Sequence, residues 1–190
     1  MTYFTTQKDA NNYLMQSNTH WTHKKGHIPV TWSKEDYTKI RTKRNYDTPN
    51  NHSGAFYDKK HFGIYGDNLG SCVLAPDEVM PDVFLTLCSH FDLKETVCVI
   101  NSYQPGQVLP FHRDTYQTYA KNKQVSDISK IVRVIMFLHD QIPGQQLWIE
   151  DKMYPGNAGF WVAWQGDCVH MAANLSDEAR YVLQFTGIAE

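Results

Sequence analysis

The sequence lacks any long apolar run. None of its 190 residues falls in a stretch near the roughly 18 consecutive apolar residues that indicate a membrane-spanning helix. The first residues, MTYFTTQK, do not show the charged segment followed by an apolar segment that is typical of a secretory signal. We therefore expect a cytoplasmic protein with no membrane partner.

Cysteine is scarce. The four cysteines, Cys72, Cys88, Cys98 and Cys168, form no C-x-x-C pair and no short spacing. This spacing argues against a zinc site built from cysteines. In a chain long enough to bury a core, we expect reduced thiols rather than disulfides.

A strong charge of either sign is also missing. The 18 basic and 20 acidic residues give a formal charge of −2, which excludes a basic protein that grips nucleic acid with its whole surface. The chain is 42% hydrophobic and 20% charged, so it can bury a core. Its length predicts a single domain over residues 1–190.

The two halves of the chain have different patterns. Residues 1–95 are polar and predict a layer of helices and loops. Helices are indicated after Asp9, from Ser33 to Arg44, and from Pro81, where Phe84 and Leu87 begin a helical spacing. Residues 96–190 are rich in Val, Ile and aromatics, broken by Pro-Gly and similar turns. This half predicts seven short strands, at 97–104, 109–113, 130–139, 145–150, 158–164, 168–174 and 179–187.

Seven short strands with turn signals favour a sandwich or barrel over alternating strands and helices. An eighth strand would come from 62–65 or from 71–74. The expected fold is therefore mainly β, a jelly-roll-like core at 96–190 under a helical N-terminal layer.

Two His-x-Asp tripeptides occur, His90-Phe-Asp92 and His112-Arg-Asp114, and chance alone would give about one. His90 ends an amphipathic helix, where a cation near the C-terminus is ordinary helix chemistry. His112 lies in a strand-like stretch of the β-rich half. We take His90 as structural and His112 with Asp114 as candidate metal ligands.

A third ligand is available in His170, which follows the turn Gln165-Gly-Asp and opens a strand. Two imidazoles and one carboxylate on one face of an octahedron hold Fe(II) and leave positions open for other ligands. Ten residues later comes Arg180, inside a strand that otherwise reads Tyr-Val-Leu-Gln-Phe. A buried arginine there is costly unless it meets an anion, and its planar fork suits a carboxylate.

At these residues the chain resembles the Fe(II)- and 2-oxoglutarate-dependent dioxygenases, over about residues 96–190. The resemblance implies a double-stranded β-helix, in which His112, Asp114 and His170 bind Fe(II) and Arg180 binds 2-oxoglutarate. It also implies conversion of 2-oxoglutarate and O2 to succinate and CO2, with hydroxylation of an unactivated C–H bond.

The segment Asn101-x-Tyr103-x-x-Gly106 ahead of His112 is similar to AlkB-type nucleic-acid demethylases, in which the Asn and Tyr touch 2-oxoglutarate. That pattern then wants an arginine six residues after Arg180, where this chain has Thr186.

Two other segments look more like the amino-acid and protein hydroxylases, including prolyl and asparaginyl types. They are His170-x-x-x-Asn174-x-Ser176-x-x-x-Arg180, and Arg133-Val-Ile-Met-Phe-Leu followed by Gly144-Gln-Gln-Leu-Trp.

Other interpretations of these residues stay open. The candidate ligands and Arg180 could be core histidines and ion pairs. Asn101 and Tyr103 could be a turn residue and a core aromatic. Arg133 is an ion-pair residue or a second carboxylate clamp, and Asn174 orients either the cofactor or the loop to Ser176.

Residues 20–46 carry a net charge of +5 with aromatics such as Trp32 and Tyr37 between the charges. This composition occurs in platforms for single-stranded nucleic acid, although a solvated helix face explains it better. His20, His23 and His27 resemble a metal clip but lie in a polar stretch without an apolar face.

The sequence thus predicts a hydroxylase that uses Fe(II), 2-oxoglutarate and O2 on an amino acid, a peptide or a small metabolite. The alternatives are an AlkB-like demethylase acting on nucleic acid and a non-catalytic jelly-roll module that binds a metal or ligand. Specificity is expected from residues 1–95 and from a loop at 115–129, where Tyr116 and Tyr119 either line the mouth or fold over the core.

Overall fold

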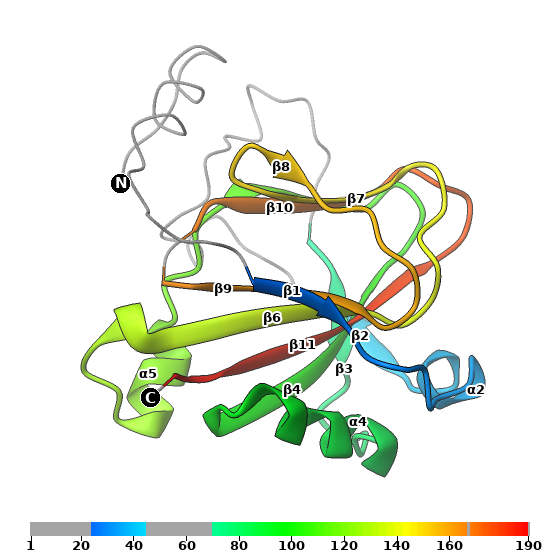
Figure 1. Cartoon of the computed structure of the whole chain (residues 1–190). Helices are drawn as coiled ribbons and strands as arrows, with labels where there is room; N and C mark the ends of the chain where they lie inside the picture. The colour runs from blue at the N-terminus through cyan, green and yellow to red at the C-terminus, as the bar shows by residue number, and fades with distance from the viewer. Residues whose placement is uncertain (1–23, 45–69, 167, 190) are drawn as a thin grey trace.

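The computed structural model describes residues 24–44, 70–166 and 168–189, which form two facing β-sheets (Figure 1). The large sheet has the strand order β1-β9-β6-β11-β4-β3-β2, and the small sheet has the order β5-β10-β7-β8. The large sheet consists of β1 (Lys24–His27), β9 (Phe160–Gln165), β6 (Ile131–Phe137), β11 (Arg180–Ile188), β4 (Lys94–Tyr103), β3 (Cys72–Leu74) and β2 (Thr42–Arg44). The small sheet consists of β5 (Val108–His112), β10 (His170–Asn174), β7 (Gln145–Ile149) and β8 (Lys152–Met153).

The chain winds back and forth between the two sheets. From β4 in the large sheet it crosses to β5, returns as β6, crosses to β7 and β8, returns as β9, crosses to β10 and returns as β11. Paired strands within each sheet are antiparallel. This winding is that of a double-stranded β-helix, so the predicted fold class is confirmed.

Successive side chains of the large sheet alternate between two cores. On β11, Val182 packs between the sheets, while Leu183 and Phe185 pack on the outer face. Helix α4 (Asp82–Leu87) covers that outer face with Phe84 and Leu87. Both faces of β11 are covered, yet three of its side chains that face the small sheet, Arg180, Gln184 and Thr186, are polar or charged.

All seven strands predicted for the second half are present, and their ends lie within three residues of the predicted ones. The two-residue strand β8 was not predicted. Of the two candidates for a further strand, 71–74 contains β3, whereas 62–65 lies outside the described residues.

The N-terminal half contains more strand than predicted. Its described part adds β1, β2 and β3 to the large sheet. The helix predicted from Ser33 to Arg44 is wrong: one turn, α2 (Glu35–Thr38), is followed by β2. The backbone groups of β2 are instead paired with those of β3 in the large sheet. The helix predicted after Asp9 lies outside the described residues.

The helix predicted from Pro81 is confirmed as α4 followed by a 3-10 turn, η2 (Cys88–Phe91). The prediction of a loop over 115–129 is wrong, because this segment contains helix α5 (Gln117–Lys123) and the start of the 3-10 turn η3 (Ile128–Lys130). The Glu95 carboxylate accepts from Lys123 Nζ at 2.9 Å, and the Glu95 carbonyl accepts from the Tyr119 hydroxyl at 3.0 Å. These contacts fasten α5 to β4.

The four cysteines all lie in the described part of the chain, and no disulfide joins them, as expected. Among the described helices, none has the length and apolar character required to cross a membrane.

Candidate metal centre

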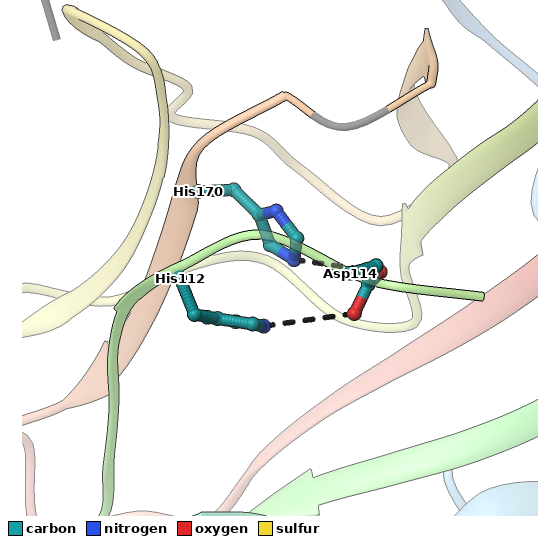
Figure 2. A group of neighbouring side chains, drawn as sticks. All are labelled: His112, Asp114 and His170. Carbon is teal, nitrogen blue, oxygen red and sulfur yellow. Dashed lines mark ion pairs between the residues drawn. The ribbon is translucent and has the colours of Figure 1, made fainter. Parts of the chain in front are cut away.

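Three side chains predicted as metal ligands lie together between the two sheets (Figure 2). His112 ends β5, His170 begins β10, and the two residues are direct partners in the antiparallel pairing of these strands. Their ring centroids are 4.2 Å apart. Asp114 follows two residues after His112, and one ligand atom from each of the three residues lies within 4.8 Å of the others.

Backbone carbonyls fix which nitrogen of each imidazole carries the hydrogen. His112 Nδ1 lies 2.8 Å from the Pro110 carbonyl oxygen, and His170 Nδ1 lies 3.0 Å from the Cys168 carbonyl oxygen. A carbonyl oxygen only accepts, so each Nδ1 donates and each Nε2 carries a lone pair. Each Nε2 lies 3.8 Å from a different oxygen of the Asp114 carboxylate. The site therefore turns three electron-pair donors toward one another, an arrangement suited to a cation.

The Asp114 carboxylate is also held by Arg133 of β6, whose Nη2 donates to Oδ2 at 2.7 Å. Burial works to lower the pKa of Arg133, but the Asp114 carboxylate and the Tyr116 hydroxyl together outweigh it, so that the pKa is raised. Arg133 is thus an ion-pair residue, one of the two roles expected for it. Because it binds one carboxylate oxygen, it orients the other.

Arg180 lies on the wall of the same cavity, which has a volume of about 450 Å³ and is also lined by His112, Asp114 and His170. Its side chain is buried, with 1% relative exposure. All three guanidinium nitrogens are buried and have no hydrogen-bond partner among the described residues. Burial lowers the pKa of Arg180 to about 10. The rings of Tyr103 and Phe137 lie 5.2 and 5.3 Å from its Cζ, and such contacts compensate only a part of the lost hydration.

Asn101 and Tyr103 also line this cavity, on the face of β4 that faces the small sheet. Tyr103 pairs with Arg180 across the β4–β11 ladder. Asn101 Nδ2 donates to Gln184 Oε1 at 2.9 Å, so one of its donors is used within the protein. Asn174 orients the loop, because it donates to the carbonyls of Tyr103 and Glu178 and accepts from Ser176.

The second His-x-Asp tripeptide is remote from the metal centre. His90 is exposed in η2, and Asp92 has a left-handed backbone on the outer side of the large sheet. Of the three histidines in the clip-like segment, His20, His23 and His27, only His27 is described, and its Nε2 lies 2.9 Å from the Ala158 carbonyl oxygen. His20 and His23 lie outside the described residues.

The described part of the basic segment is not a helix face. Its lysines between residues 24 and 43 are exposed, whereas Trp32 and Tyr37 are buried. Trp32 Nε1 donates to the Leu138 carbonyl, and the Tyr37 ring stacks on His139. These two aromatics are core residues rather than stacking surfaces for bases.

Sequence analysis missed two further residues of the cavity wall. The ring centroid of Trp164 lies 4.9 Å from that of His170, and its buried Nε1 has no hydrogen-bond partner among the described residues. Gln184 lies four residues after Arg180 on the same face of β11. The two-residue period of a strand could have predicted that Gln184 lines the same cavity as Arg180. The position of Trp164 on the cavity wall could be predicted only from the pairing of β9 with β6.

No family model matches the sequence, and no curated protein sequence matches it. Solved structures do show similar folds. A prolyl-4-hydroxylase from Pseudomonas putida matches with a TM-score of 0.46 and 17% identity, over 64% of this chain and 72% of that chain. An oxidoreductase of the 2OG-Fe(II) oxygenase family from Burkholderia pseudomallei matches with a TM-score of 0.43 and 13% identity, over 62% and 66%.

A sugar phosphate isomerase of the cupin superfamily from Silicibacter pomeroyi matches with a TM-score of 0.42 and 12% identity, over 79% of this chain and 72% of that chain. These likenesses concern the fold alone. The fold and the site together define a double-stranded β-helix protein with a candidate His-Asp-His metal centre. A reaction has to be argued from the side chains of the cavity.

Proposed function

We propose that this protein is an Fe(II)- and 2-oxoglutarate-dependent oxygenase that hydroxylates an amino acid, a peptide or a small metabolite. The observation that carries the proposal is Arg180, a buried cation with no hydrogen-bond partner among the described residues, on the wall of the cavity that holds His112, Asp114 and His170. A buried unpaired charge is costly. A carboxylate ligand bound in the cavity would supply both the missing charge and the missing hydrogen-bond acceptors.

The residues of the metal centre fit Fe(II). Two imidazole Nε2 atoms and one carboxylate form the donor set of non-haem iron sites, and this set leaves coordination positions for other ligands. When bound, Fe(II) with 2-oxoglutarate and O2 supplies the oxidation that breaks an unactivated C–H bond, with succinate and CO2 as products. His112 and His170 are held in the required tautomer by the carbonyls of Pro110 and Cys168.

Arg180 would bind the carboxylate of 2-oxoglutarate that lies away from the metal. Its guanidinium offers two parallel donors to a carboxylate. The rings of Tyr103 and Phe137 beside it keep water out of this end of the cavity. Desolvation strengthens the charge-assisted hydrogen bonds, since the local dielectric is low.

The metal assignment is tested with two tripeptides of the same chain. We expect His112→Ala, Asp114→Ala and His170→Ala each to abolish tight Fe(II) binding in anaerobic titrations. His90→Ala and Asp92→Ala are matched controls and should bind Fe(II) like the parent. Loss of iron from His90→Ala with retention by His112→Ala would overturn the assignment.

The Arg180 assignment is tested by titrating 2-oxoglutarate into the Fe(II)-loaded protein and following the visible iron-to-ketoacid absorption band. Arg180→Lys should weaken 2-oxoglutarate, and Arg180→Ala should weaken it by roughly thirtyfold or more. Fe(II) affinity should stay close to that of the parent in both variants. Unchanged 2-oxoglutarate affinity in folded Arg180→Ala would refute the role. Binding of both ligands with no succinate formed, for any amino-acid, peptide or nucleic-acid pool, would indicate a non-catalytic module.

A further inference from the structure

A second cavity, of about 410 Å³, lies between α5 and the large sheet. Its wall includes Val97 and Val99 of β4, Gln184 and Thr186 of β11, and most of the segment from Asp114 to Lys123 (α5 and the end of β11 lie close together in Figure 1). Val99, Asp114, Arg133 and Gln184 line both cavities. The two cavities therefore adjoin at the carboxylate of the candidate metal centre.

The charged groups at this second cavity are already paired within the protein. Asp114 binds Arg133 at 2.7 Å, and Lys123 binds Glu95 at 2.9 Å. The rest of the lining is neutral and consists of Val97, Val99, Thr115, Tyr116, Gln117, Thr118, Tyr119, Asn122, Gln184 and Thr186. A charged ligand would lose its hydration here without gaining a counter-charge, which is unfavourable. An uncharged ligand with polar groups matches the hydroxyls and carboxamides of the wall.

Tyr116 is the residue of this wall with unused hydrogen-bonding capacity. Its side chain is 6% exposed, and its buried hydroxyl interacts with the neighbouring Arg133 guanidinium but makes no hydrogen bond of good geometry within the described residues. Because a guanidinium only donates, the hydrogen of the Tyr116 hydroxyl remains for a ligand. Its backbone is left-handed, with φ +51°, a conformation that is unfavourable for a bulky side chain. The ring lies beside the Arg133 guanidinium, with Cζ 5.3 Å from the ring centroid. Residue 116 thus combines a strained backbone with a buried hydroxyl whose hydrogen-bonding capacity is not fully used.

Gln184 supplies a second polar group. Its Oε1 accepts from Asn101 Nδ2 at 2.9 Å, so its Nε2 hydrogens are the donors that remain for a ligand. Tyr116 can donate and accept, and Gln184 can donate. A hydroxyl or a carboxamide can pair with both groups, whereas an aliphatic group can pair with neither.

We infer that the cavity between α5 and the large sheet binds the substrate to be oxidised, and that this substrate presents an uncharged polar group, a hydroxyl or a carboxamide, to Tyr116 and Gln184. The inference rests on the proposed function, which assigns the first cavity and Arg180 to the co-substrate. It adds a substrate class and two binding residues to that function.

Four probes test the inference by calorimetry on the full chain loaded with Fe(II) and 2-oxoglutarate without O2. They are the N-acetyl, N-methylamide forms of glutamine, glutamate, threonine and valine, so that one pair differs in charge and the other in polarity. We expect the glutamine and threonine probes to bind with dissociation constants of roughly 1–10 mM. The glutamate and valine probes should bind at least about tenfold more weakly, since a site built around hydrogen bonds rejects analogues that cannot make them.

The variant Tyr116→Phe removes the hydroxyl alone. It should weaken the glutamine and threonine probes by about tenfold, the effect of one lost hydrogen bond. Its melting temperature should equal or exceed that of the parent, because a buried hydroxyl whose hydrogen-bonding capacity is not fully used is removed. Tyr181→Phe is the matched control, since Tyr181 packs against Tyr37 on the outer side of the large sheet, and it should leave probe binding unchanged.

Three results would overturn the inference: equal or tighter binding of the glutamate probe, no binding by either polar probe, or unchanged polar-probe binding in Tyr116→Phe. Succinate formation without any probe reports the proposed function separately. Probe binding without succinate would retain the cavity assignment and refute the oxygenase. Succinate without probe binding would do the reverse.

Discussion

Two arginines line the cavity between the sheets from neighbouring strands, and their surroundings are opposite. Arg133 of β6 contacts the Asp114 carboxylate, and its pKa is raised. Arg180 of β11 contacts the rings of Tyr103 and Phe137, and burial lowers its pKa to about 10. One cation is neutralised by the chain, and the other lacks a counter-charge among the described residues. Under the proposed function, the metal would lie at the end of the cavity near Arg133 and Asp114, and the carboxylate of 2-oxoglutarate would lie at the end near Arg180.

The largest expected difference between these arginines is in the sign of their effect on stability. Arg133→Met leaves the half-buried Asp114 carboxylate without its Arg133 partner and should lower the free energy of unfolding by roughly 3 kcal/mol. Arg180→Met removes an unpaired buried charge and keeps an apolar side chain, so it should raise the free energy of unfolding by about 1 kcal/mol. Urea unfolding of the metal-free proteins measures both changes.

The exposed Arg41, which pairs with Asp77 and Glu78, gives the control. Arg41→Met should change the free energy of unfolding by less than about 1 kcal/mol, as is usual for surface ion pairs. If Arg180→Met proves as destabilising as Arg133→Met, Arg180 is compensated in a way that the comparison does not allow.

The two arginines also show which features of the site could be predicted from the sequence and which could not. Spacing placed His112, His170 and Arg180 on short strands and Asp114 directly after the first of them, and a fold with a two-residue side-chain period brings such residues to one cavity. The role of Arg133 depends on which residue lies next to it in the folded protein, and a local sequence pattern does not predict that neighbour. Arg133 pairs across the β6–β11 ladder with Thr186, the position at which the AlkB-type pattern has its second arginine.

The errors in secondary structure have the same origin. The segment of α5 reads Gln-Thr-Tyr-Ala-Lys-Asn-Lys and lacks the apolar spacing of an amphipathic helix. Its contacts with Glu95 come from β4, more than twenty residues earlier in the chain. The segment of β2 contains good helix formers, and its pairing with β3 overrides them. Tertiary pairing, rather than local propensity, decides both segments.

The second prediction compares the effects of the two arginines on metal affinity. Arg133 is a positioning residue, since its Nη2 donates to Asp114 Oδ2 and thereby orients the carboxylate. Arg133→Met should lower the affinity for Fe(II) by roughly 10–100-fold, the usual effect of losing a residue that orients a metal ligand. Arg133→Lys should recover part of the affinity, because an ammonium keeps the charge without the planar fork. Arg180→Met should leave Fe(II) affinity close to the parent value in the same titration.

The smallest expected effect is read at His139, which precedes the loop beyond β6. Its Nδ1 donates to the Asp140 carbonyl at 2.9 Å, and its Nε2 accepts from the Tyr181 amide at 3.0 Å, so the ring is neutral in the folded protein. Burial lowers the pKa of His139 from its ordinary 6.5, and the charge of Arg180 lowers it further, against Glu178 and Asp140, which raise it. His139 therefore senses the uncompensated charge of Arg180.

In Arg180→Met, we expect the pKa of His139 to rise, because one of the contributions that lower it is gone. In the parent, the unfolded chain takes up a proton at His139 before the folded chain does as the pH falls. The stability that neutral His139 contributes is thus complete above about pH 6.5 and is lost as the pH falls through the folded-state pKa. In the variant the folded-state pKa is closer to 6.5, so the pH range over which this stability is lost becomes narrower, and its lower limit rises. Titration of the His139 imidazole by NMR, with Arg41→Met as the control, measures the shift directly. An unchanged pKa in Arg180→Met would mean that the Arg180 charge is already balanced, and the contrast with Arg133 would fail.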